Sequence, residues 1–440
     1  MTDPTAAQRQ WYEKTLRYAE AVNTFVAKGL SVGWDSAGAE PREPKYKEEL
    51  PHFMEALRDA NRETPHRDIK SEWPPSHAAL YPLLEKNGLS IPALCVLPDG
   101  DILARIGATY EDGKVVRIQG DAITEVQGVQ HFGRCPGRRY FAVATAAGVD
   151  IHDGWRGPRV ITCPWPNGDE GVPVDFDMQA QAAPPAPSQL LPFPDGQRVL
   201  LVASSGIFVL DQEGATRLLP TEEQMREHFQ WVRDEGGKDG DFSPSLSMEH
   251  AAISPDGKLI ALGAQDGEHY VLDEQLNLIA QVEPHGEYPH HAVFSADGRS
   301  VAFNACHLYN GATIAVPVAM LADWQSDYYD NADGSTVIEP SARVYASISR
   351  GDEFILGDAY GYLRAVSREG EPRWQHFIGS TISALDLSAD GRTLVASTCA
   401  GFVSIIDLDA GRQPYQIGNG EHFEQRRWLF WKDEATPLAW

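Results

Sequence analysis

One pattern recurs along most of this chain: a short apolar run, a tight turn with aspartate and glycine, a second apolar run and a second glycine turn. A full copy is HAAISPDGKLIALGAQDGEHYVLD, residues 250–273. Its first turn contains Pro255, Asp256 and Gly257, where proline presets φ, aspartate bonds the local backbone and glycine accepts a positive φ. Apolar runs that alternate with such turns predict three short strands within the copy.

The repeat can be counted from its turn glycines. Seven units each have a first-turn glycine followed by a second-turn glycine, and in four units the two lie 10 residues apart. Successive first glycines are 37, 59, 61, 41, 53 and 40 residues apart, which gives a base period near 40 residues with three longer intervals. Because a four-stranded β-propeller blade takes about 40 to 45 residues, the spacing predicts seven blades. The pairs are Gly100/Gly113, Gly137/Gly148, Gly196/Gly206, Gly257/Gly267, Gly298/Gly311, Gly351/Gly361 and Gly391/Gly401.

Three units carry a family resemblance. The segments ISPDGKLIALGAQDGEHYVLD, FSADGRSVAFNA and LSADGRTLVASTCAGFVSIIDLD resemble WD40 and related YVTN-type propeller repeats. The resemblance covers about residues 91–418 and implies a ring of four-stranded blades. Leu272 and Ile406 stand before aspartate where WD40 repeats have tryptophan, so the resemblance concerns the fold. The expected class is all-β, a seven-bladed β-propeller with an N-terminal α-helical extension.

Residues 1–90 differ from the repeats. Apolar side chains at helical spacing predict helices over 6–28 and 46–62, and they favour a third over 77–86, although Pro82 weakens that prediction. Apolar helical faces usually pack on their own protein, so this N-terminal extension is expected to dock on the propeller. The alternative is an arm that binds a partner protein.

The end of the chain, residues 419–440, is rich in tryptophan. Trp428, Trp431 and Trp440 would be costly to expose so near one another. The segment is therefore expected to pack on the propeller, where it would close the ring or hold the N-terminal helices. A hairpin around the sequence KDEA is predicted within it.

Composition restricts the possible partners and compartments. With 37 basic and 63 acidic residues the formal net charge is -26, which argues against a nucleic-acid partner and favours one with a basic surface. The five cysteines are scattered without metal-ligand spacing, as expected for free thiols in a reducing compartment. The first residues do not resemble a signal peptide, and no run of eighteen apolar residues occurs. A soluble, cytoplasmic protein without a membrane partner is expected.

The long intervals of the repeat predict where this propeller binds, because loops on a rigid ring carry function. One insert, 164–188, is predicted to be an extended surface loop. A second insert, 221–234, is predicted to be a helix that begins with a capping box. A third insert, 321–340, combines aromatic and acidic residues. Together they predict a non-enzymatic protein–protein interaction scaffold that needs no cofactor. The predicted partner-binding residues are Phe229, Trp231, Trp324, Tyr328 and Tyr329.

The alternative function uses the channel of the ring. His250 and His291 both lie seven residues before a first-turn glycine, so neighbouring blades place histidine at one equivalent position, with Glu249, His285 and His290 close in sequence. Imidazole and carboxylate groups are usual metal ligands and acid–base groups. This pattern raises the hypothesis of a metal-dependent enzyme or small-ligand binder at the channel mouth, with His250, His291 and Glu249 as its residues. The opposing interpretation is a set of channel-lining side chains bonded to water. The motifs GxSxG, HExxH, GxxxxGK[ST] and a strand-linked GxGxxG are absent from the sequence.

Overall fold

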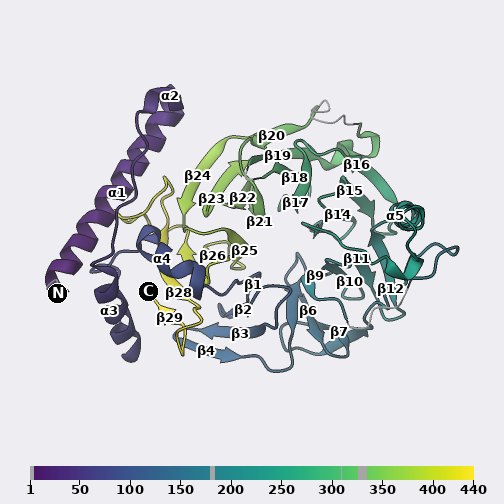
Figure 1. Cartoon of the computed structure of the whole chain (residues 1–440), viewed down its shortest axis with the longest axis horizontal. Helices are drawn as coiled ribbons and strands as arrows, with labels where there is room; N and C mark the ends of the chain where they lie inside the picture. Colours follow the sequence, from purple (N-terminus) through teal and green to yellow (C-terminus); the bar gives the residue numbers. More distant parts are fainter. Residues whose placement is uncertain (1–3, 179–183, 309, 326–333) are drawn as a thin grey trace.

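The fold is a ring of antiparallel sheets, known from a computed structural model that describes residues 4–178, 184–308, 310–325 and 334–440. Seven sheets are arranged around a central axis (Figure 1), six with four strands and the last with five. In every sheet the strands are neighbours in chain order. The seven-bladed β-propeller predicted from the glycine spacing is thus confirmed.

Each blade is a simple meander, so its strands can be given in chain order. Blades 1 to 4 consist of β1 (Ala93–Val96), β2 (Ile102–Ile106), β3 (Lys114–Gln119), β4 (Ala122–Glu125); β5 (His131–Arg134), β6 (Tyr140–Thr145), β7 (Gly148–Asp153), β8 (Arg159–Cys163); β9 (Pro187–Pro192), β10 (Val199–Ala203), β11 (Gly206–Leu210), β12 (Ala215–Leu219); β13 (His250–Ile253), β14 (Leu259–Gly263), β15 (His269–Asp273) and β16 (Leu278–Val282). Blades 5 to 7 consist of β17 (Tyr288–Phe294), β18 (Ser300–His307), β19 (Asn310–Pro317), β20 (Thr336–Glu339); β21 (Val344–Arg350), β22 (Glu353–Asp358), β23 (Tyr362–Ser367), β24 (Pro372–Phe377); β25 (Ile382–Leu387), β26 (Thr393–Thr398), β27 (Phe402–Asp407), β28 (Phe423–Leu429) and β29 (Leu438–Ala439).

A local hydrogen-bond pattern explains why the first turn recurs. In blade 4, Ser254 Oγ donates to Asp256 Oδ1 at 2.7 Å and accepts from the Leu259 N–H at 2.9 Å, while Gly257 has φ +76. The side chains thereby stabilise the turn that glycine's free backbone permits. The same serine and aspartate bonds form at Ser295/Asp297 in blade 5 and Ser388/Asp390 in blade 7.

The core lies between the blades. Strands β10 and β11 are buried along their full length, because apolar side chains on one face pack on blade 2 and those on the other face pack on blade 4. Strands covered on both faces have continuous apolar sequences instead of alternating ones. The ring is therefore held by successive layers of side chains between blades, and its rim remains free to carry inserts.

Residues 419–440 contribute strands to the last blade. Strand β28 pairs with β27, and β29 pairs with β28 through Trp428↔Ala439 and Leu429↔Leu438. The predicted hairpin around KDEA is present. The last sheet thus extends beyond residue 418, where the sequence analysis placed the end of the propeller.

The helices before the first blade lie beside blade 7 (Figure 1). They are α1 (Pro4–Val32), α2 (Trp34–Ala37), α3 (Leu50–Arg62) and α4 (His77–Asn87), and α4 continues through Pro82. Trp11 is fully buried against Phe53 at a ring separation of 4.5 Å and against Trp440 at 6.3 Å. The indoles of Trp11 and Trp440 donate to the carbonyls of Pro74 and Trp73. Both ends of the chain thus share one aromatic cluster. Within the described residues, no helix combines the length and apolar character needed to cross a membrane.

Candidate binding surfaces

Two inserts that are distant in sequence pack together at the rim of blade 3. The helix α5 (Glu222–Asp234) buries Met225 and Phe229, and Phe176 of the first insert stacks on Phe229 with ring centroids 4.6 Å apart. Met178 and Phe242 complete this apolar cluster. We call residues 164–178 together with residues 221–246 the rim module, which includes α5 (Figure 1).

A half-buried arginine fixes the first insert to the ring. Arg217 on β12 donates to the backbone carbonyls of Glu170, Gly168 and Ser205, each at 2.8 Å, and its guanidinium lies 4.5 Å from the Phe208 ring centre. Burial lowers the pKa of Arg217 to about 10. A partly buried cation is tolerated where carbonyl oxygens satisfy its donors, so this contact fixes the first insert against β12.

Polar contacts join the two halves of the rim module on its outer side. Arg233 of α5 forms a bidentate pair with Asp239 at 2.6 Å and donates to the Asp175 carbonyl of the first insert at 2.9 Å. Asp239 also accepts the Asp177 N–H at 3.0 Å. These bonds link both inserts around one aspartate, so the module presents a defined surface.

The predicted partner-binding residues lie in different environments, and only some of them are exposed. The capping box at Thr221 and Gln224 is confirmed, and it begins a helix whose inner face includes Phe229. Phe229 is fully buried and is not available to a partner, whereas Trp231 is 63% exposed on the outer face. Trp324 is half-buried against the apolar layer between blades 4 and 5. Tyr328 and Tyr329 lie outside the described residues.

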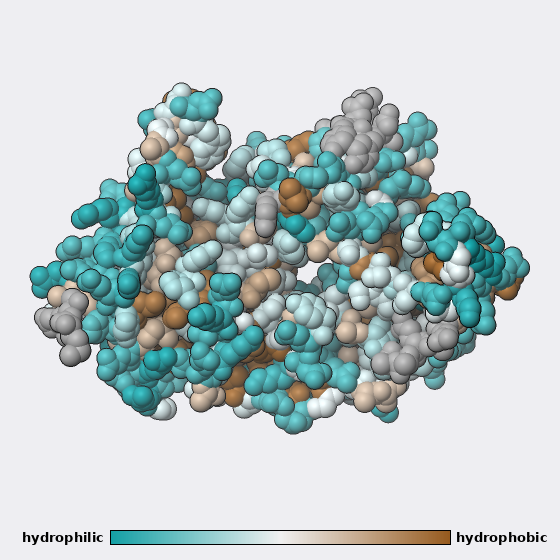
Figure 2. Space-filling view, viewed as in Figure 1, coloured by the Kyte–Doolittle hydropathy of each residue, from teal (hydrophilic) through white to brown (hydrophobic). Residues whose placement is uncertain are grey.

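The outer face of α5 is acidic around its tryptophan. Glu227, Asp234 and Glu235 are exposed and lie four residues before, three after and four after Trp231, which places them beside it on the helix surface. The same module carries Val174, which is 97% exposed. Figure 2 shows that this end of the molecule is largely hydrophilic. A single large aromatic surrounded by acids is therefore the main apolar feature of this helix face.

The central channel is a second candidate site. A cavity of about 440 Å³ is lined by residues from the innermost strands of all seven blades, β1, β5, β9, β13, β17, β21 and β25. Figure 2 shows the hollow at the middle of the ring. Its polar lining includes Gln189, Ser347 and Ser383, among apolar side chains that range from alanine to phenylalanine. This volume lies within the range of about 300 to 1,000 Å³ typical of small-molecule sites.

The histidines of the channel hypothesis are buried and engaged by the protein. His250 Nδ1 lies 2.8 Å from the Met248 carbonyl, and its Nε2 lies 3.1 Å from His269 Nδ1. Since Nδ1 donates to the carbonyl, Nε2 accepts from His269. His291 Nε2 lies 2.7 Å from Ser347 Oγ, and the rings of His250 and His291 are 6.5 Å apart. Burial lowers the pKa of His250 to about 4 and that of His291 to about 3, so both are neutral.

The remaining residues near these histidines have separate roles. His290 Nδ1 bonds to the Val344 carbonyl at 2.6 Å, and its Nε2 accepts from Arg343 at 2.9 Å. Glu249 is half-buried, and burial raises the pKa of its carboxyl. Across the described ranges of the chain, no group of three His, Cys, Asp or Glu side chains is arranged to hold a metal ion.

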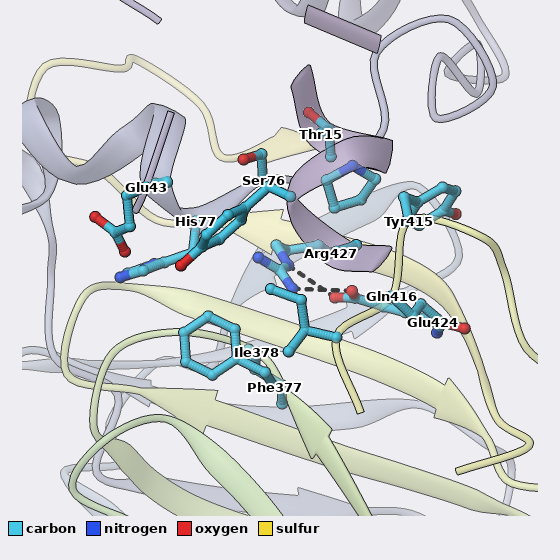
Figure 3. Close-up of a pocket in the computed structure, with 15 residues that line it drawn as sticks. Thr15, Glu43, Ser76, His77, Phe377, Ile378, Tyr415, Gln416, Glu424 and Arg427 are labelled. Carbon is cyan, nitrogen blue, oxygen red and sulfur yellow. Dashed lines mark hydrogen bonds and ion pairs between the residues drawn. The ribbon is translucent and has the colours of Figure 1, made fainter. Parts of the chain in front are cut away.

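A third polar site, which the sequence did not indicate, lies between α1 and blade 7. Figure 3 shows Arg427 of β28 in a bidentate pair with Glu424, with N–O distances of 2.7 and 2.9 Å. Both residues are 3% exposed. Burial opposes the ionisation of Glu424, but the Arg427 charge outweighs it and holds the pKa below its usual value. The pocket above the pair is narrow and is lined by His77 and Tyr415. We interpret it as a structural junction between the helices and the ring.

Comparison with known proteins assigns this chain to no family. No family model matches the sequence, and no curated protein matches it. Among solved structures, the chain is similar to the computationally designed Ika8 protein in crystal packing No. 1 in P63, at 15% sequence identity and a TM-score of 0.42. That alignment covers 73% of this chain and 97% of the Ika8 chain. The class of the protein, a seven-bladed β-propeller with helices before its first blade, rests on its own sheets.

Proposed function

We propose that this protein is a non-catalytic interaction scaffold of WD40-like architecture that binds a protein partner through the rim module. The observation that carries the proposal is Trp231, which is 63% exposed on a helix whose inner face is held by the buried side chains of Met225 and Phe229. Tryptophan is enriched among binding hot spots, and a rigid support lowers the entropy lost on binding. The partner segment would carry basic residues around an apolar contact, because acids surround Trp231.

Two further observations support the proposal. Arg226 and Arg233, the arginines of α5, are paired with acids of the rim module itself. The acids beside Trp231 therefore dominate the charge that the outer face presents, and complementary charge steers association. The five cysteines are free, as expected for the reducing cytoplasm in which we place this function.

Site-specific photo-crosslinking tests the proposal on the full chain. A photoreactive phenylalanine derivative at position 231, introduced in the native host, is expected to crosslink one protein with a basic segment. The matched control is position 278, because Leu278 is 55% exposed on the outer strand of blade 4. Equal crosslinking at both positions, or none at position 231, would contradict the proposal.

Substitution of Trp231 measures how much this side chain contributes to the affinity for the partner. For the crosslinked partner, Trp231→Ala is expected to raise Kd about 30-fold, which corresponds to the loss of about 2 kcal/mol at a hot spot. Leu278→Ala should leave Kd unchanged. Isothermal titration calorimetry at constant salt measures both values. Glu227→Lys is expected to slow association, which surface plasmon resonance measures.

A further inference from the structure

The central channel carries a positive charge in a strongly acidic protein. The chain has a formal net charge of -26, yet the charged residues that line the channel in the described structure are Arg134, Arg138 and Asp386. The histidines in the lining, His131 and His291, are neutral because burial lowers the pKa of each to about 3. The lining therefore has one cation in excess.

The single carboxylate is already saturated. Asp386 is 2% exposed, and Arg134 binds both of its oxygens, through Nε to Oδ2 at 3.2 Å and through a second, short contact to Oδ1. The Val96 N–H donates to Oδ2 at 2.7 Å, and the Leu387 N–H donates to Oδ1 at 2.8 Å. Asp386 thus joins three blades by neutralising Arg134, and it has little capacity for another cation.

Arg138 is the cation in excess. Its Nη2 reaches Asp386 Oδ1 at 3.4 Å, which is long for a hydrogen bond between charged groups. Its side chain is 24% exposed and lines the cavity, and φ is +62 in a residue other than glycine. Such a backbone conformation is costly and persists where the surroundings hold it. A guanidinium stays charged in proteins, and Asp386, the carboxylate nearest to Arg138, is already neutralised by Arg134, so Arg138 has no carboxylate of its own among the described lining residues.

We propose that the channel binds a small organic anion, with its carboxylate or phosphate group on Arg138. Arg138 supplies the fork of donors that matches a planar or tetrahedral anion. The cavity of about 440 Å³ accommodates a small metabolite. This site is independent of the rim module, and neither proposal depends on the other.

Titration calorimetry of the full chain tests the proposal with three probes: succinate, inorganic phosphate and the neutral analogue succinamide. Saturable binding of succinate or phosphate, and none of succinamide, is the expected result. Binding of succinate identifies a carboxylate ligand, and binding of phosphate alone identifies a phosphate group. Failure of both anions to saturate the protein at about 10 mM, a very weak affinity, would overturn the proposal.

The neighbouring arginine is a matched control. Arg138→Asn removes the guanidinium with a residue that tolerates positive φ, and it is expected to weaken anion binding about tenfold or more. Arg139→Asn changes the net charge equally in the same turn, but the Arg139 side chain is 65% exposed and paired with Asp153. It should leave affinity unchanged. Equal weakening by both substitutions would assign the effect to net charge and overturn the site.

If Arg138→Asn fails to fold, an anion probe in crystals of the unaltered protein tests whether Arg138 binds an anion. Bromide soaked into the crystals should give an anomalous peak within hydrogen-bond distance of the Arg138 guanidinium. Bromide peaks at other places, with none in the channel, would overturn the proposal.

Discussion

Lowering the pH from about 7 to about 5 is expected to remove an amount of stability comparable to the whole free energy of unfolding. The cause is a set of buried histidines that the fold keeps neutral, with pKa values lowered by burial to about 3 or about 4. They are His77, His131, His250, His290, His291 and His376.

The direction follows from proton binding. In the unfolded chain a histidine has a pKa of about 6.5. Between that value and the lower folded values the unfolded chain binds more protons, so stability is complete above pH 6.5 and decreases as the pH falls towards 4. At pH 5 each histidine removes about 2 kcal/mol, and the six together remove on the order of 10 kcal/mol. Glu249, Glu268 and Glu353, whose pKa values burial raises, act in the opposite direction at lower pH.

Near-ultraviolet circular dichroism as a function of pH measures the effect. The signal of the packed aromatic residues should disappear with a midpoint between about pH 4 and about pH 6. A native signal that persists to about pH 4 would show that the histidines take up protons without unfolding.

One variant and one control assign the effect to particular side chains. The loss of unfolding free energy between pH 7 and pH 6 should be smaller by about 0.7 kcal/mol in His291→Gln, because one titrating group is removed. His228→Gln, at an exposed position of α5, should leave that loss unchanged. Urea unfolding at the two pH values gives the comparison.

Glu424→Gln is expected to destabilise the protein by about 3 to 5 kcal/mol, because it leaves the Arg427 guanidinium buried without its carboxylate. Removing one member of a buried pair costs more than removing both, since the remaining charge is uncompensated. The double variant Glu424→Gln/Arg427→Met should therefore recover part of the stability. The midpoint of urea unfolding at pH 7 measures each variant.

A surface pair provides the control for this prediction. Asp153→Asn breaks the pair with Arg139, where both side chains are well exposed, and should leave the urea midpoint unchanged. Equal midpoints for Glu424→Gln and the unaltered protein would mean that the Arg427 charge reaches water. The junction between the helices and blade 7 would then not depend on the pair.

The candidate site was only partly predictable from sequence. The apolar side of α5 was evident from Met225 and Phe229, but nothing in the spacing showed that Phe176 of another insert covers it. Phe229 was therefore assigned to a partner although it serves the core. Trp231 could be recognised, because it lies off the apolar face of the helix. The excess charge of the channel had no sequence signal, since Arg138 and Arg139 are adjacent and differ by the direction of their side chains.

The sequence by itself determined the number of blades and the turns within them, because those features depend on residues a few positions apart. Ser254 donates to Asp256 and accepts from the Gly257 N–H wherever the segment lies. Tertiary structure alone decided which distant groups meet. Trp11 contacts Trp440, Arg134 contacts Asp386, and Arg217 holds the insert of Glu170. The physical reason is that closing the ring brings together segments that share no local pattern, and burial then determines which charges remain unpaired.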